Sequence, residues 1–302
     1  MRKINNVILC GMGAVGSIYA DILKDYSPID FRVLLDKARL ERYTKNPMIY
    51  NGKILNVNYL LPEAPNFKSD LIIIATKMSG LDDALSQIKN FVGKDTIILP
   101  LLNGVMSEEI IASHYGREQV LYSYFIGHSS VRTGNSIVHD GVNTIVFGSD
   151  NPNDKESVLI VKNFFDECGI SYEIPEDIKH SLWAKFMLNV SSNPTTALLR
   201  KNFGQMLSSD KFMALATKIM KEVQAVAKAE GINNSEKLID ETLEKLNTMC
   251  PEGKTSMFQD VLAGRKTENE IFAGAVVQLG KKHGIATPYC CILKEFFDII
   301  DE

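Results

Sequence analysis

Apolar residues in the first half of the chain occur in short strand-like runs, separated by stretches in which they recur at helical spacing. Short, mostly apolar runs are typical of strands buried in a parallel sheet, whereas a spacing of three and four residues is typical of amphipathic helices. Strands are predicted at residues 6–10, 31–35, 71–75 and 96–102, and helices at residues 15–24 and 80–91. This alternation of strands and helices predicts an α/β fold with a Rossmann-type domain.

The pattern becomes rich in β-structure from residue 120 onward. Segments at residues 122–127, 136–139 and 143–147 are separated by glycine-containing turns, which predicts antiparallel sheet added to the parallel one. Earlier in the chain, Asn51-Gly52 lies between apolar flanks within residues 48–54, and this dipeptide favours a tight hairpin turn. A helix at residues 154–168 and a last strand at residues 170–174 complete this part of the chain.

Strand patterns disappear after Pro175-Glu176-Asp177, where we place the domain boundary. A chain of 302 residues is longer than one typical core, so two domains are expected. We predict a dinucleotide-binding domain over residues 1–174 and an all-α substrate and catalytic domain over residues 175–302. Helical spacing in the second domain covers residues 178–193, 212–230, 235–246, 256–262, 269–283 and 290–299.

A glycine-rich segment joins the first predicted strand to the first predicted helix. It reads Gly11-Met12-Gly13-Ala14-Val15-Gly16. The first glycine permits a tight turn, the second lets the backbone approach a pyrophosphate, and the third lets the helix pack closely on the strand. The N–H groups at the helix start then face the anion. The alternative, an ordinary glycine-rich turn, explains the strand–turn–helix context less well, so all six residues are candidates for cofactor binding.

An acidic residue, Asp36, follows the second predicted strand. A carboxylate at this strand end commonly binds the ribose 2′-hydroxyl of NAD, whereas a basic residue accepts the 2′-phosphate of NADP. Asp36 therefore favours NAD. Lys37 and Arg39 follow it closely and are able to reach a phosphate, and the alternative is that all three residues form a solvated turn.

Two further polar residues follow the ends of predicted parallel strands. Ligands of such sheets bind outside the carboxyl ends of the strands, which makes Lys77 and Asn103 candidates for contact with the cofactor. An asparagine amide both donates and accepts hydrogen bonds, as the junction of cofactor and substrate requires. The alternatives are an exposed lysine at a helix start and a turn asparagine with a left-handed backbone.

The bulk composition excludes several classes of partner. A net charge of −4, a pI near 5.8 and the absence of a dense Lys/Arg stripe argue against nucleic-acid and acidic-membrane partners. There is no apolar run of about 18 residues, so no membrane span is predicted. The five cysteines form no C-x-x-C pair and indicate a reducing compartment. We expect a cytoplasmic protein, and the five histidines have no metal-ligand spacing, so no metal is expected.

Three polar residues recur every fourth position in the first predicted helix of the second domain. Lys185, Asn189 and Asn193 lie along one helix face, and Pro194 is expected to end or kink the helix. Reduction of a ketone by hydride needs a proton donor where negative charge develops, and a partly buried ammonium group serves this purpose near neutral pH. The alternative is an exposed polar stripe, although two asparagines in a helix interior lower its propensity.

The chain resembles the 2-dehydropantoate 2-reductase (ketopantoate reductase) family over nearly its whole length. The resemblance is carried by the order and spacing of several motifs together with the amino-terminal glycines. These are Asn103-Gly104, Lys185, Asn189, Asn193-Pro194, Ser256-Met257-Phe258-Gln259-Asp260 and Thr267-Glu268.

The resemblance implies NADPH-dependent reduction of 2-dehydropantoate to (R)-pantoate, a step toward pantothenate and coenzyme A. It implies that Lys185 is the catalytic proton donor and that Glu268 holds the substrate in the catalytic centre. The remaining roles are also carried over from the family: Asn189 and Asn193 for the substrate hydroxyl, Ser256 for its carboxylate, Asn103 for the reacting region and Lys77 for the cofactor.

One departure from the family pattern concerns the cofactor. NADPH-dependent members usually carry a basic residue where this chain has Asp36. On the strength of the resemblance we still expect a modest preference for NADPH, and because of Asp36 we expect NAD to be tolerated. A related alternative is an NAD-dependent D-2-hydroxyacid dehydrogenase for branched 2-oxo acids. A catalytically silent NAD(P)-sensing protein is an alternative of another class, but it need not retain both Lys185 and Glu268. The sequence does not decide whether the chain forms a homodimer, because the amphipathic carboxy-terminal helices suit either an interface or the second core.

Overall fold

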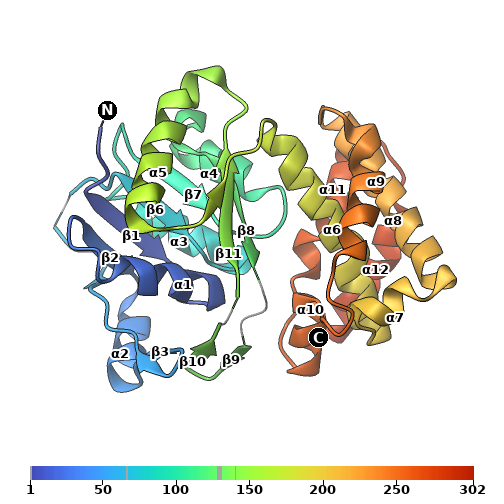
Figure 1. Cartoon of the computed structure of the whole chain (residues 1–302), viewed down its shortest axis with the longest axis horizontal. Coiled ribbons are helices and arrows are strands. Elements are labelled where there is room, and N and C mark those ends of the chain that lie inside the picture. Colours follow the sequence, from blue (N-terminus) through green and yellow to red (C-terminus); the bar gives the residue numbers. More distant parts are fainter. Residues whose placement is uncertain (1, 66, 128–130, 140) are drawn as a thin grey trace. The chain divides into compact units, whose positions relative to one another are not determined.

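The computed structural model describes residues 2–65, 67–127, 131–139 and 141–302, and its elements are labelled in Figure 1. The chain divides into two compact units. The first comprises Met1–Asn103 and Ser107–Ile178, and the second comprises Gly104–Met106 and Lys179–Glu302. The α/β class, with a Rossmann-type parallel sheet followed by a helical part, is confirmed.

A five-stranded parallel sheet with the order β5-β2-β1-β6-β7 forms the centre of the first unit. Its strands are β1 (Asn6–Cys10), β2 (Asp30–Leu34), β5 (Tyr59–Leu60), β6 (Leu71–Ile74) and β7 (Ile97–Pro100). All four residues of β6 and all four of β7 are buried. This burial on both faces explains why the sequence reads as continuous apolar runs there.

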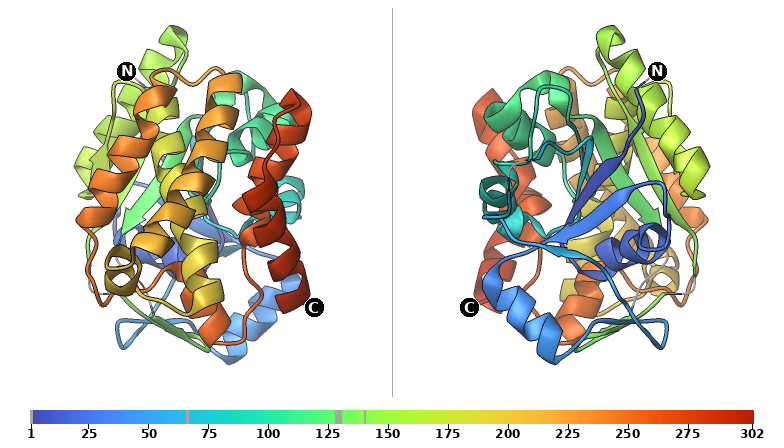
Figure 2. Two further views of the ribbon diagram at one scale, coloured as in Figure 1. Left: turned by 90° about the vertical axis from the view of Figure 1, so that its right-hand side faces the viewer. Right: turned by 90° about the vertical axis from the view of Figure 1, so that its left-hand side faces the viewer.

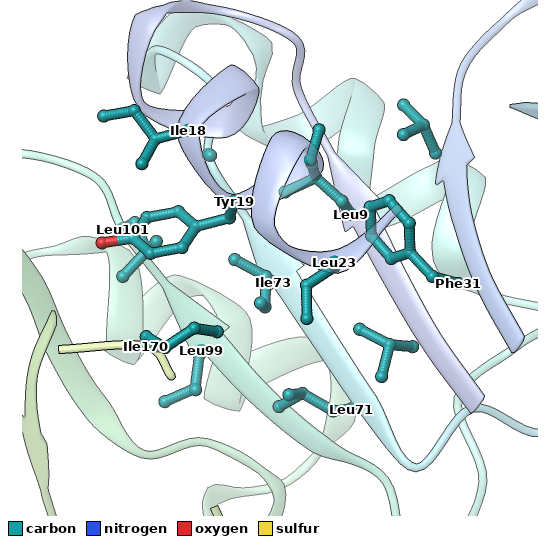
Figure 3. Close-up of a cluster of buried hydrophobic side chains, with 14 of the residues drawn as sticks. Leu9, Ile18, Tyr19, Leu23, Phe31, Leu71, Ile73, Leu99, Leu101 and Ile170 are labelled. Atoms are coloured by element: carbon teal, nitrogen blue, oxygen red, sulfur yellow. The ribbon is translucent and has the colours of Figure 1, made fainter. Parts of the chain in front are cut away.

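Helices cover both faces of this sheet. Their bounds are α1 (Ala14–Leu23), α3 (Leu81–Ile88), α4 (Ser107–Tyr115) and α5 (Lys155–Cys168). Because side chains alternate along a strand, Leu9 and Ile73 join one cluster with residues of α1 and α5, whereas Ile8 and Ile72 join another with residues of α3 and α4. Figure 3 shows the first cluster, in which Leu9, Ile73 and Leu99 lie among Ile18, Tyr19 and Leu23 of α1.

The remaining strands form two smaller sheets. One has the order β4-β3-β10-β9 and the other β12-β11-β8. Their bounds are β3 (Ile49–Tyr50), β4 (Lys53–Ile54), β8 (Tyr122–Gly127), β9 (Val131–Thr133), β10 (Ser136–Val138), β11 (Asn143–Gly148) and β12 (Tyr172–Glu173). The predicted hairpin is confirmed, since Asn51 and Gly52 both have positive φ between β3 and β4. The predicted antiparallel pairing is confirmed for β8 and β11. Its addition to the parallel sheet is wrong, because β8 and β11 lie in a separate sheet with β12, and β10 lies in the other small sheet, parallel to β3 and antiparallel to β9.

Helix α2 (Lys37–Lys45) was not predicted from the sequence. Only Tyr43 is buried among its residues, so the helix has no apolar stripe that the periodicity reveals. Its start also replaces the solvated turn that was considered for Asp36. Short 3₁₀ helices complete the unit at η1 (Met78–Gly80), η2 (Arg117–Gln119) and η3 (Pro152–Asp154).

Among the described residues of the second unit, all regular secondary structure is helical. Their bounds are α6 (Ile178–Leu199, which begins on the last residue of the first unit), α7 (Phe203–Leu207), α8 (Asp210–Ala229), η4 (Ser235–Lys237), α9 (Leu238–Asn247), α10 (Ser256–Leu262), η5 (Asn269–Ile271), α11 (Ala273–His283) and α12 (Pro288–Ile300). Helices α8, α11 and α12 contact one another and appear in yellow to red in the left view of Figure 2. The Glu222 carboxylate of α8 accepts the backbone N–H groups of Tyr289 and Cys290, which fixes the start of α12.

Helix α6 does not end at Asn193, as the sequence predicted, but continues through Pro194 to Leu199. Proline lacks the N–H group that the carbonyl four residues earlier would accept. Neighbouring hydroxyls supply other bonds along this turn. Thr195 Oγ1 donates to the Ser191 carbonyl at 2.6 Å, and Thr196 Oγ1 donates to the Ser192 carbonyl at 2.6 Å. These bonds occupy the carbonyls that follow that of Val190, which is the one that Pro194 leaves without its intrahelical N–H.

None of the helices in the described part of the chain is both long enough and apolar enough to span a membrane.

Candidate functional site

The glycine loop lies at the carboxyl end of β1, between β2 and β6 in the sheet. Gly11 has φ +102°, and a Cβ atom there would lie 2.5 Å from the Ala75 carbonyl oxygen. At Gly16 a Cβ atom would lie only 1.9 Å from the Gly11 carbonyl oxygen. Both positions therefore require glycine, because side chains would prevent the close approach of strand, loop and helix.

The start of α1 has the properties of a dinucleotide cradle. Gly13 is the N-cap residue and its side-chain position offers no hydrogen bond, so the first N–H groups of α1 depend on another acceptor. A Cβ atom at Gly13 would meet no heavy atom within 4 Å, which leaves room beside these groups. At the neighbouring end of β6, the buried Thr76 hydroxyl has no hydrogen-bond partner among the described residues. These features fit a bound pyrophosphate.

Asp36 caps helix α2 and faces its first turn. Its carboxylate accepts the Arg39 backbone N–H at 2.7 Å and pairs with the Arg39 guanidinium at 3.0 Å. Lys37, the other basic residue predicted to reach a phosphate, pairs with Glu63 at 3.6 Å. The carboxylate at the end of β2 is therefore held in place by a helix cap and a cation.

Lys77 and Asn103 follow the ends of β6 and β7, on the same edge of the sheet as the glycine loop. Lys77 is exposed and precedes η1, whereas Asn103 is half-buried three residues after Pro100. The left-handed residue of this turn is Gly104, with φ +97°, and Asn103 has no positive φ. The alternative that Asn103 serves as a left-handed turn residue is therefore wrong.

The second unit holds the other candidate residues, and α6 carries three of them. Lys185 and Asn189 are half-buried, and Asn193 is 4% exposed. The Asn193 Nδ2 group donates to Asn189 Oδ1 at 3.3 Å. Since residues four apart on a helix are neighbours, Lys185 lies one turn before Asn189 on the same face.

Asn193 also connects α6 to the start of α10. Its Oδ1 atom accepts the Ser256 hydroxyl at 3.1 Å and the Met257 backbone N–H at 3.2 Å. The Met257 N–H needs an acceptor, which fixes the orientation of the Asn193 amide. A parallel contact, 2.8 Å long, joins the hydroxyls of Thr196 and Thr255. The structure thus brings Asn189, Asn193 and Ser256 into one hydrogen-bonded chain.

Glu268 is half-buried between two anchored residues. Thr267 donates its backbone N–H and its hydroxyl to the Asp301 carboxylate, at 2.9 and 2.6 Å. On the other side, the Asn269 amide donates to the Leu293 carbonyl at 3.3 Å. Both contacts lead to α12 or the residue after it. Asp301 was not predicted from the sequence, since nothing in its sequence neighbourhood indicates a contact 34 residues away.

The described residues contain no group of three or more His, Cys, Asp or Glu side chains that could hold a metal ion. His128, one of the five histidines considered in the sequence, lies outside the described residues.

Two family models cover most of the chain. Residues 7–152 match Ketopantoate reductase PanE/ApbA, and residues 177–299 match Ketopantoate reductase PanE/ApbA C terminal. The chain belongs to the ketopantoate reductase family. This confirms the resemblance found in the sequence and makes the chain an NAD(P)-dependent oxidoreductase.

Relatives within and around the ketopantoate reductase family span nearly the full chain. The 2-dehydropantoate 2-reductase of Streptococcus pyogenes serotype M1 is 27% identical over 296 residues, which cover 96% of this chain and 95% of the relative. The 2-dehydropantoate 2-reductase of Geobacter metallireducens has a TM-score of 0.83 at 26% identity, covering 97% and 99%. A ternary structure of D-mandelate dehydrogenase with NADH and anilino(oxo)acetate has a TM-score of 0.86 at 23% identity, covering 98% of both chains. The last likeness shows a shared fold.

Proposed function

We propose that this ketopantoate reductase family member reduces 2-dehydropantoate to (R)-pantoate. When bound, the nicotinamide supplies a hydride to C2 of the 2-oxo acid, and Lys185 supplies the proton that turns the carbonyl oxygen into a hydroxyl. The observation that carries this proposal is the polar chain from α6 to α10, in which Asn189 and Asn193, on the helix that bears Lys185, are linked to Ser256 of α10. The 27% identity to named 2-dehydropantoate 2-reductases supports the substrate.

The candidate residues of the second unit offer the chemistry that a small hydroxylated 2-oxo acid needs. The Lys185 ammonium stabilises negative charge on the carbonyl oxygen and donates a proton to it. The Ser256 hydroxyl, on an exposed residue at the first turn of α10, donates its one proton to Asn193 in this structure, and it would bind a carboxylate by exchanging that bond for one to the substrate. Glu268 suits a hydroxyl group as an acceptor. The Asn193 Oδ1 atom already accepts two bonds and one amide N–H donates to Asn189, so only the other amide N–H of this residue is assigned to substrate.

The direct test measures oxidation of NADH and NADPH with 2-dehydropantoate and, in parallel, with 2-oxoisovalerate. We expect turnover with 2-dehydropantoate and a loss of at least about 100-fold in kcat/KM for Lys185→Ala, as for removal of a general acid. The matched control is Lys179→Ala, because Lys179 is a half-buried lysine on the same helix, six residues before Lys185. If Lys185→Ala retains kcat/KM within about threefold of wild type, the assigned role is untenable.

The same assay separates the competing functions. Preference for 2-oxoisovalerate over 2-dehydropantoate would favour a D-2-hydroxyacid dehydrogenase of branched substrates. Binding of a dinucleotide without turnover of either 2-oxo acid would favour an NAD(P)-sensing protein. Either result would replace the proposed function.

For the cofactor, we infer that NADH binds more tightly than NADPH, although the family resemblance implies NADPH. The Asp36 carboxylate cannot turn away without giving up the N-cap of α2 and its pairing with Arg39, which together stabilise its position by about 1 kcal/mol or more. A fixed anion at the end of β2 accepts a ribose 2′-hydroxyl but repels a 2′-phosphate. Both nearby cations are already paired with carboxylates.

Dinucleotide binding, measured by fluorescence without substrate, tests this inference separately from catalysis. We expect the Kd of NADPH to exceed that of NADH by about tenfold, equivalent to about 1.4 kcal/mol. Asp36→Asn keeps a good N-cap while removing the charge, so it should improve NADPH binding most. Lys37→Gln controls for a general change of charge. Tighter binding of NADPH than of NADH by the wild type would refute the inference.

A further inference from the structure

We propose that Glu108 is a positioning residue, which with Ser123 fixes the loop of residues 101–106 and thereby the Asn103 side chain. The inference rests on the proposed function in so far as Asn103 serves the cofactor and substrate. The hydrogen bonds that carry it join residues of the first unit, to which Asn103 also belongs, whereas Gly104–Met106 of the loop are counted with the second unit. Neither Glu108 nor Ser123 stood out in the sequence.

Ser123, on β8, bonds to both ends of this loop. Its hydroxyl donates to the Pro100 carbonyl at 2.7 Å, at the end of β7 where the loop begins. Its backbone N–H donates to Glu108 Oε1 at 3.4 Å, in the first turn of α4 where the loop has ended. The other carboxylate oxygen of Glu108 accepts the Ser107 hydroxyl at 2.9 Å. Six residues, including Asn103, thus run between two fixed points.

These contacts are deeply buried, since Ser107 is 2% exposed and Glu108 and Ser123 are each 1% exposed. A buried carboxylate is costly unless hydrogen bonds compensate it. An apolar residue at position 108 would fill the same space without that cost, so packing alone does not explain an acid here. The position in the first turn of α4 favours negative charge, and the two hydrogen bonds use both oxygens of Glu108.

The surroundings of Glu108 keep its protonation state responsive to pH. Burial raises the pKa of the Glu108 carboxyl to about 7, against the opposing effects of hydrogen bonds to Ser107 and Ser123 and of the Arg117 charge. The Arg117 guanidinium is shared with Glu109, at 3.8 Å, and lies over the Tyr122 ring. On α3, which packs against α4, the acidic residues Asp82 and Asp83 are exposed.

Protonation changes what the Glu108 carboxyl group can do. An ionised carboxylate only accepts hydrogen bonds, whereas a protonated one turns an oxygen into a donor. The protonated group cannot accept from both Ser107 and Ser123 as well as the ionised group does. The hydrogen bonds that hold the ends of the loop carrying Asn103 should therefore change as the pH passes through 7.

The test uses the full chain and compares Glu108→Gln, Ser123→Ala and the control Glu109→Gln. Glutamine imitates the neutral acid with nearly the same shape, and Ser123→Ala removes the bond to Pro100 without altering charge. We expect faster amide hydrogen exchange in residues 101–106 for the first two variants and a fall of about fivefold to tenfold in kcat/KM, as for loss of a buried hydrogen bond. The wild type should show a step near pH 7 in kcat that Glu108→Gln lacks.

A second comparison asks whether Glu108 acts through Asn103. In the Asn103→Ala background, Glu108→Gln should cause little further loss of activity, because residues acting through one another are not additive. Exchange in residues 101–106 that is unchanged by Glu108→Gln and by Ser123→Ala would overturn the inference, as would additive losses with Asn103→Ala. If the wild type reduces no 2-oxo acid, the proposed function fails, but hydrogen exchange still tests the role of Glu108.

Discussion

The Asn193 side chain is assigned here both to substrate and to the internal structure of the second unit, and a single substitution separates the two roles. Asn193→Ala removes three hydrogen bonds, to Asn189, to Ser256 and to the Met257 N–H. If Asn193 only contacts substrate, this substitution lowers activity and leaves stability unchanged. If it also joins α6 to α10, the substitution lowers both.

The expected loss of stability follows from these contacts. A buried hydrogen bond contributes about 1 kcal/mol on average, and a buried donor left without an acceptor costs about 1–3 kcal/mol. Asn193 is 4% exposed and Met257 is 1% exposed, so water does not readily replace the lost bonds. We expect a decrease of about 3 kcal/mol in the free energy of unfolding. For a unit of this size that corresponds to a fall of roughly 10 °C in Tm.

Thermal unfolding followed by circular dichroism, with and without NADH, measures this change. Ser256→Ala is the matched control, because it removes one of the three bonds and leaves the Met257 N–H paired with Asn193. We expect it to lower Tm by only about 3–4 °C. A Tm for Asn193→Ala within 2 °C of the wild type would refute the structural role. A large fall in Tm with unchanged KM would refute the assignment to substrate.

Three further predictions concern other parts of the molecule. Gly16→Ala should abolish NADH binding, because its Cβ atom would lie 1.9 Å from the Gly11 carbonyl oxygen. The control Gly13→Ala should fold normally, because its Cβ atom would meet no heavy atom within 4 Å. Fluorescence titration with NADH and the Tm of both variants check this difference. The raised pKa of Glu108, about 7, means that the folded state binds more protons than the unfolded state between about pH 4.5 and 7. The contribution of Glu108 to stability is therefore complete below pH 4.5 and is lost as the pH rises through 7. Urea unfolding of the wild type and of Glu108→Gln at about pH 5.5 and about pH 8.5 measures this dependence. A pH dependence that is the same in both proteins would contradict the prediction. Asp301→Asn should lower kcat by loosening the segment that bears Glu268, while leaving NADH affinity unchanged in a direct titration.

The fold was predictable wherever burial leaves a simple pattern in the sequence. The strands β6 and β7 are buried along their whole length and therefore read as continuous apolar runs. Helix α2 buries one residue and leaves no such pattern. The pairing of β10 with β3 joins segments more than 80 residues apart, and a local pattern of alternating residues carries no information about such a partner.

The candidate site was predictable only as far as one helix. Lys185, Asn189 and Asn193 share a face because of their spacing, and spacing is visible in a sequence. The bond from Asn193 to Ser256 spans 63 residues, and only the folded structure brings the two together. The sequence around Pro194 was interpreted as a helix end, although α6 continues there. Serine and threonine are common at helix caps, but they also bond to backbone carbonyls within a helix, and the sequence alone does not distinguish the two cases.

These contacts imply that the candidate residues of the second unit do not act independently. Asn193 orients Asn189 through its amide nitrogen and fixes Ser256 through its amide oxygen, so a substitution at one position changes the placement of the others. Effects of Asn193→Ala and Ser256→Ala on kcat/KM should therefore be smaller in combination than their product. Lys185 lies beyond this chain by one helical turn, and a conservative Lys185→Arg substitution should reduce kcat without changing Tm, because it keeps the charge but loses the readily transferred proton.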